Sequence, residues 1–133
     1  MRNPFQPGDI QVYSFVVGPQ DFAVLNGKLI QPVLSTFALG QALEWASRQF
    51  VELMLEAGEA GIGTMLTIKH RAPAFEGETV EIQAIFERLE GAELTCHVQA
   101  YVGERLLATG RTGQRIVDAG KLQARFQELR QKL

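Results

Sequence analysis

Residues 32–57, PVLSTFALGQALEWASRQFVELMLEA, decide the fold because they give the chain a helical period. Apolar residues recur there at three- and four-residue steps, which places them on one broad stripe of an α-helix. Ser35 or Thr36 is placed to cap its start, and Gly58 lies just past its end. The stripe needs a sheet or another helix to cover it and consists of Leu39, Ala42, Leu43, Ala46, Phe50, Leu53, Met54 and Ala57.

The sequence on both sides of this helix predicts β-strands. Residues 10–17 are rich in β-branched and aromatic side chains, and residues 64–71 alternate between two faces. Three further strands are expected at 79–89, 94–102 and 106–117, separated by turn signals. A strand, a long helix and then four strands in an antiparallel meander predict an α+β fold, with a curved sheet of about five strands wrapped around the helix.

The remaining segments predict a connection and a short terminal helix. Residues 18–31 carry glycine, proline, aspartate and asparagine and are expected to form a loop or short irregular structure. The tail from Asp118 predicts an amphipathic helix whose apolar contacts are Leu122, Phe126 and Leu129. No linker or repeat divides the chain, so residues 1–133 are expected to form a single domain.

Composition limits the classes of partner. A formal net charge of −2 favours neither nucleic acid nor an anionic membrane. Cys96 is the only cysteine, which excludes an intrachain disulfide and a cysteine-cluster metal site. No apolar run approaches the roughly 20 residues that span a bilayer, and the N-terminus lacks the apolar core of a signal peptide. The expected location is therefore the cytoplasm, with no membrane partner.

His70 is the clearest polar residue in an inward position. It continues the strand face of Leu66 and Ile68, which should meet the helix, whereas His97 lies on the solvent face of its strand. A lone inward histidine is more often a structural residue. Its ordinary pKa near 6.5 nevertheless suits general acid or base chemistry, and the pattern leaves both roles open.

Glu44 and Thr36 are two further candidates on the helix. Glu44 lies at the border of the apolar stripe, where Gly40 leaves room for a ligand against the helix. The alternative, an ion pair with Arg48 worth a few tenths of a kcal/mol, is favoured by periodicity alone. Thr36 suits a plain N-cap, although free N–H groups at a helix start also suit a developing oxyanion.

Several short runs carry a family resemblance. They are Ser35-Thr36-Phe37, Gly40, Leu43-Glu44-Trp45-Ala46, Gly61-Ile62-Gly63-Thr64, Thr67 and His70. In this order and spacing the chain resembles the fluoroacetyl-CoA thioesterase family of hotdog proteins, and the resemblance covers most of its length. It implies a hotdog fold and hydrolysis of a short or otherwise small acyl-CoA thioester to free acid and CoA.

The resemblance also implies roles for particular residues. Thr36, Glu44 and His70 match the catalytic threonine, glutamate and histidine of the family, and Gly63 matches a glycine near the acyl-binding pocket. Phe22 is the only phenylalanine in residues 18–31, a segment that resembles an acyl-selecting lid but is shorter than in members that handle fluoroacetyl groups. The resemblance therefore implies thioester hydrolysis rather than fluoroacetyl specificity. The expected substrate contacts are Gly63 and Phe22, from the resemblance, and Gly40, from its position on the helix.

The implied mechanism gives Glu44 an activating or nucleophilic role, Thr36 the role of nucleophile or water positioner, and His70 general acid–base work. Backbone N–H groups near the helix start or at Gly63 are the expected oxyanion donors. No metal and no cofactor beyond the CoA of the substrate is expected. Thr36 and Glu44 are eight residues apart, hence roughly 12 Å along an ideal helix and about 80° around it.

That separation leaves two possibilities: the helix starts after Thr36 and the chain bends back, or two subunits share the site. The resemblance favours a dimer interface and therefore a homodimer or higher homo-oligomer. Three other readings remain. A hotdog dehydratase usually has an aspartate shortly before its histidine, which neither His70 nor His97 has. A non-catalytic acyl-CoA-binding or regulatory hotdog module stays open, and a ligand-binding cone fits the early helix less well.

Overall fold

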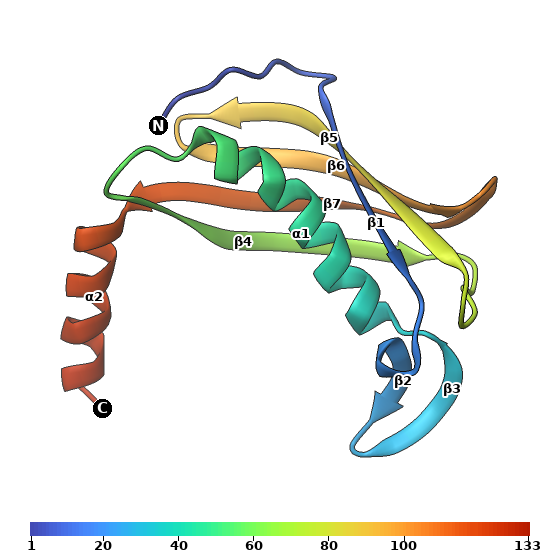
Figure 1. Cartoon of the computed structure of the whole chain (residues 1–133). Coiled ribbons are helices and arrows are strands. Elements are labelled where there is room, and N and C mark those ends of the chain that lie inside the picture. Colours follow the sequence, from blue (N-terminus) through green and yellow to red (C-terminus); the bar gives the residue numbers. More distant parts are fainter.

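The computed structural model describes residues 1–133 and contains a five-stranded antiparallel sheet crossed by one long helix (Figure 1). The elements in chain order are β1 (Ile10–Val16), a 3-10 turn η1 (Pro19–Asp21), β2 (Phe22–Leu25), β3 (Lys28–Leu34), α1 (Thr36–Met54), β4 (Glu59–His70), β5 (Thr79–Glu90), β6 (Glu93–Val102), β7 (Arg105–Asp118) and α2 (Ala119–Gln131). The expected α+β architecture, with a long central helix, a sheet of about five strands and a C-terminal helix, is confirmed.

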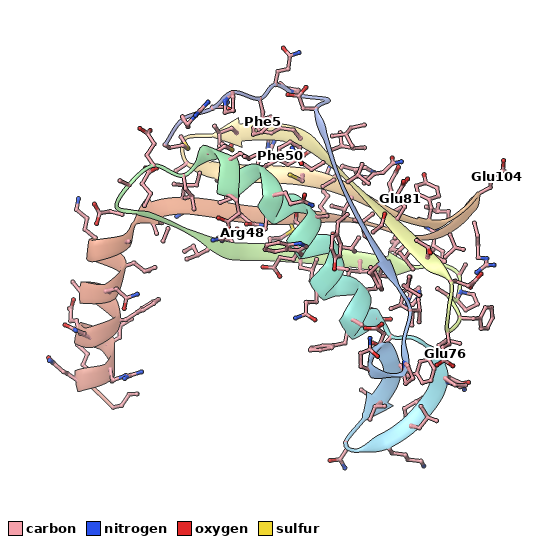
Figure 2. All side chains as sticks on the ribbon, in the orientation of Figure 1. Phe5, Arg48, Phe50, Glu76, Glu81 and Glu104 are labelled. Atoms are coloured by element: carbon pink, nitrogen blue, oxygen red, sulfur yellow. The ribbon has the colours of Figure 1, made fainter.

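Helix α1 lies against the sheet through most of its predicted apolar stripe. Its stripe residues Leu39, Leu43, Ala46, Phe50 and Met54 are fully buried, whereas Leu53 is 54% exposed. The opposing wall consists of Val80, Ile82, Ala84, Phe86, Leu94, Cys96, Val98 and Ala100. The N-terminal segment closes one end of this core, where the ring of Phe5 meets that of Phe50 edge-on at 4.9 Å between centroids (Figure 2).

The structure decides which of the two candidate residues, Ser35 or Thr36, caps the start of α1. Ser35 is the N-cap, and its Oγ accepts a hydrogen bond from the Ala38 N–H at 2.9 Å. The helix therefore begins at Thr36 and not at Pro32, and the hydroxyl of Thr36 is free for another contact. At the other end α1 stops at Met54, so Ala57 lies outside it.

The order of strands in the sheet is β1-β5-β6-β7-β4, which corrects the expected four-strand meander. β5, β6 and β7 do follow one another through tight turns, but β4 pairs with β7, from Glu59 opposite Asp118 to His70 opposite Ala108. Residues 71–78 carry the chain from β4 to the opposite side of this meander, a step that a two-residue turn does not allow. β4 is consequently an edge strand.

β4 is longer than the predicted strand at 64–71 because it includes Gly61 and Gly63. A register shift between Gly63 and Met65 marks a β-bulge, which inserts one extra residue into the alternation. Both glycines therefore face α1 before the bulge, and Ile68 and His70 face it afterwards. The inward position predicted for His70 is confirmed.

Residues 18–31 are more regular than expected. After η1, strands β2 and β3 form a separate two-stranded hairpin. Its turn is Asn26-Gly27, whose φ angles of 52° and 74° suit a two-residue hairpin connection. The prediction of a loop was wrong because Asn26-Gly27 is not a break but the turn between two paired apolar runs.

Helix α2 makes only part of the apolar contacts that its pattern predicts: Leu122 is partly buried, but Phe126 and Leu129 are not. Phe126 and Leu129 are 51% and 45% exposed, and no residue of α2 is buried. Figure 1 shows α2 projecting away from the end of β7 rather than packing on the sheet. Neither helix is long and apolar enough to cross a membrane.

Candidate functional site

A row of four α1 residues faces the edge strand β4. Thr36, Gly40, Glu44 and Arg48 are spaced by four, so they lie one above another along the helix. Each meets a different part of β4, which runs from His70 near the helix start to Gly61 farther along. Helical and strand spacing together therefore align the three predicted catalytic residues along the contact between α1 and β4, which we call the seam.

Thr36 and His70 are in direct contact at one end of the seam. The Thr36 Oγ1 lies 2.9 Å from the His70 Nδ1, and the direction of the hydrogen bond depends on the imidazole tautomer. The His70 Nε2 is buried and has no hydrogen-bond partner. The Thr36–His70 pair can therefore exchange the donor and acceptor roles that a proton-transfer site requires.

Gly40 allows close approach of α1 and β4 in the middle of the seam. A Cβ at this position would lie 2.9 Å from the Ile68 Cδ1 and 3.2 Å from the Leu66 Cδ2. Beside it opens a groove of about 440 Å³, which has apolar walls and two polar ends. The groove is lined by Thr36, Phe37, Gly40, Gln41, Glu44, Leu66 and Ile68.

Glu44 lies at the other end of the groove, directly against Gly63. Its Oε1 occupies the space that a side chain on Gly63 would fill. Arg48, labelled in Figure 2, is the ion-pair partner that spacing predicts for Glu44. It bonds instead to Glu52 at 3.0 Å and to the Gly61 carbonyl oxygen at 2.7 Å. The alternative interpretation of Glu44 as half of an ion pair with Arg48 is therefore wrong, and its carboxylate faces the groove without a counter-ion.

The structure does not bring all the predicted residues together within one chain. Because α1 begins at Thr36, the separation of Thr36 from Glu44 follows ideal helix geometry, roughly 12 Å along the axis. The possibility that the chain bends back between them is excluded. Phe22 is partly buried against the core and is not among the residues lining the groove.

Comparison with known proteins identifies the family. A family model described as fluoroacetyl-CoA-specific thioesterase matches residues 17–120, a span that contains α1, β4 and the groove between them. The chain belongs to this family. It is accordingly a thioester hydrolase, and the resemblance noted in its sequence is confirmed.

Individual relatives agree with this assignment. The fluoroacetyl-CoA thioesterase of Streptantibioticus cattleyicolor is 27% identical over 96 residues, which cover 72% of this chain and 69% of the relative. A solved Thermus thermophilus protein described as a thioesterase superfamily member is 31% identical, with a TM-score of 0.92 over 97% of this chain and 96% of its own. A solved fluoroacetyl-CoA thioesterase is 26% identical, with a TM-score of 0.85 over 97% and 98%. The hotdog fold is thereby confirmed.

Gly63→Ala is expected to lower kcat by about 10–100-fold while the protein stays folded. The added methyl group would occupy the place of the Oε1 of Glu44, for which the sequence predicts a catalytic role, and a displacement of about 1 Å in a reacting group can cost two orders of magnitude. Gly113→Ala, on the neighbouring strand β7, is the matched control, because its methyl group would meet Thr64 and Met65 of β4 instead of Glu44. Steady-state kinetics and thermal unfolding of both variants test this expectation, and equal losses of kcat would refute a specific effect on Glu44.

Proposed function

We propose that this protein hydrolyses a short or otherwise small acyl-CoA thioester to the free acid and CoA, using Thr36, Glu44 and His70 at an interface between two copies. One observation carries the proposal: a single apolar groove has a hydroxyl–imidazole pair at one end and a carboxylate without a counter-ion at the other. Apolar walls suit an acyl chain, and the polar ends suit the thioester chemistry.

In the proposed reaction, Glu44 accepts a proton from a water whose oxygen attacks the thioester carbonyl carbon. The carbon–sulfur bond then breaks, and the Thr36–His70 pair supplies a proton to the departing thiolate. The Ala38 N–H is already bound to Ser35, but those of Thr36 and Phe37 precede the first helical hydrogen bond and can stabilise the oxyanion. Every step thus has a group of suitable chemistry, with Glu44 supplied by one copy and the Thr36–His70 pair by the other.

Glu44 is too far from the Thr36–His70 pair of its own chain to act with it. A second copy of the chain would bring another Glu44 close to that pair. β4 is an edge strand of 12 residues, and an unpaired strand edge can pair antiparallel with itself across a two-fold axis. Met65 and Leu66 are 39% and 41% exposed along it, which favours cover by another protein surface. In such a dimer, Glu44 of one copy would serve the Thr36–His70 pair of the other.

The proposal does not include selectivity for fluoroacetyl-CoA, which is the substrate named for two of the relatives. Phe22 is the only phenylalanine between residues 18 and 31, and it packs against the core rather than along the groove. Without an aromatic lid there, we expect acetyl and fluoroacetyl thioesters to be hydrolysed at rates within about tenfold of each other.

A hydrolysis screen tests the proposed function. Acyl-CoAs of increasing chain length, together with fluoroacetyl-CoA, are incubated with the protein, and released thiol is measured with a thiol reagent. Cys96 will not interfere, because burial raises the pKa of its thiol to about 12. We expect kcat/KM to be highest for small acyl groups. Tight binding of acyl-CoA with no hydrolysis of any thioester would instead support a binding module.

A further inference from the structure

Two buried polar side chains of β7 cross the core to α1. The Thr112 Oγ1 donates to the Ser47 Oγ at 2.7 Å, and the Ser47 Oγ donates to the Leu43 carbonyl oxygen at 3.1 Å. The Gln114 Nε2 donates to the backbone carbonyl oxygen of Glu44 at 3.3 Å. Thr112 and Gln114 are 1% and 2% exposed, so these are bridges within the protein interior.

The Gln114 side chain lies close to the Glu44 carboxylate as well as to the Glu44 backbone. It lies directly opposite Gly63 in the pairing of β7 with β4, and side chains so paired are about 4.5–5.5 Å apart at Cβ. Gly63 has no side chain, and the Glu44 carboxylate fills that space. The amide and the carboxylate are therefore neighbours on the helix-facing side of the sheet.

The orientation of the Gln114 amide follows from its partner. A backbone carbonyl can only accept a hydrogen bond, so the NH2 group must face the Glu44 carbonyl oxygen, and the Oε1 is directed away from that carbonyl oxygen. That Oε1 is buried and has no partner. An unpaired buried acceptor is costly, which favours a use for it that arises only during the reaction.

We propose that Gln114 is a positioning residue for Glu44. Its Nε2 fixes the helix backbone at Glu44, and its Oε1 accepts a hydrogen bond from the Glu44 carboxyl group once that group has taken the proton of the attacking water. A glutamine suits this task because it remains neutral and does not compete for the proton. The inference rests on the proposed function, in which Glu44 is the proton acceptor.

Gln114→Met tests the role, with Thr112→Val as the matched control. Each substitution keeps approximate size and removes one buried bridge between β7 and α1, so both should lower the melting temperature by several degrees. Only Gln114→Met should also lower kcat, by about tenfold or more with KM nearly unchanged, because it alone acts on Glu44. Loss of kcat in both variants to the same extent would overturn the proposal in favour of general packing.

Gln114→Glu provides a second test that does not depend on removing polarity. When neutral, the introduced carboxyl group keeps one donor and one acceptor. When ionised, it loses its donor and places a second negative charge beside Glu44. We expect the kcat of this variant, relative to wild type at the same pH, to decline as pH rises. A ratio that is independent of pH would count against the proposal.

Glu44→Ala, measured in parallel, separates failure of this inference from failure of the proposed function. Full activity of Glu44→Ala would refute both the role of Glu44 in the proposed function and the role of Gln114. An inactive Glu44→Ala together with wild-type kcat in Gln114→Met would remove only the role of Gln114. If the role is correct, Gln114→Met should produce no further loss in a protein that already carries Glu44→Ala.

Discussion

Glu44→Ala should lower kcat for acyl-CoA hydrolysis about a thousandfold, within the usual range for removal of a general base. The expectation follows from the surroundings of the side chain. It faces the groove without a counter-ion, because Arg48 bonds to Glu52 and Gly61 instead. KM should change little if the acyl group is held mainly by the apolar walls.

Glu44→Gln and Glu81→Ala are the controls for this result. Glu44→Gln keeps the shape and the neighbours of the side chain but removes the base, so its kcat should fall nearly as far. Glu81→Ala removes an exposed carboxylate on β5, outside the groove and away from Arg48, and should leave kcat within about twofold. Thiol release measures kcat, and circular dichroism verifies folding. A Glu44→Gln variant with near wild-type kcat would exclude Glu44 as the proton acceptor.

Local periodicity was sufficient to predict the helix-facing residues. Strand alternation placed His70 inward, and helical spacing placed Glu44 beside Gly40. Thr36 joins the same row only because α1 begins there, with Ser35 as its cap. Their contacts with β4 depend on tertiary structure. Arg48 has a glutamate four residues before it and another four residues after it, and the Gly61 carbonyl oxygen, 13 residues away, helps to fix its direction. Sequence spacing alone does not contain that contact.

Gln114 could have been found from the sequence by the criterion that selected His70. It alternates with Thr112 and Ile116 on one face of its strand, so a polar side chain was again in an inward position. The pairing of Gln114 with Gly63 is harder to predict from the sequence, because it depends on β4 lying next to β7 rather than β5. No turn signal specifies that pairing, since residues 71–78 are long enough to allow several strand orders.

A heterodimer of one Thr36→Ala subunit and one Glu44→Ala subunit should recover about one functional site, although each parent homodimer is nearly inactive. If each site takes the Thr36–His70 pair from one copy and Glu44 from the other, both defects fall in the same site and the second site is intact. Two affinity tags allow the heterodimer to be purified and its kcat per dimer measured, with about half the wild-type value expected.

The reciprocal heterodimer makes the test decisive. When a wild-type subunit is combined with one that carries both substitutions, shared sites each receive one defect, and the dimer should be nearly inactive. Sites contained within one chain would give the opposite pattern: activity in this second heterodimer and none in the first. The roughly 12 Å that separates Thr36 from Glu44 along α1 favours the first pattern, because no side chain in that row can span two helical turns.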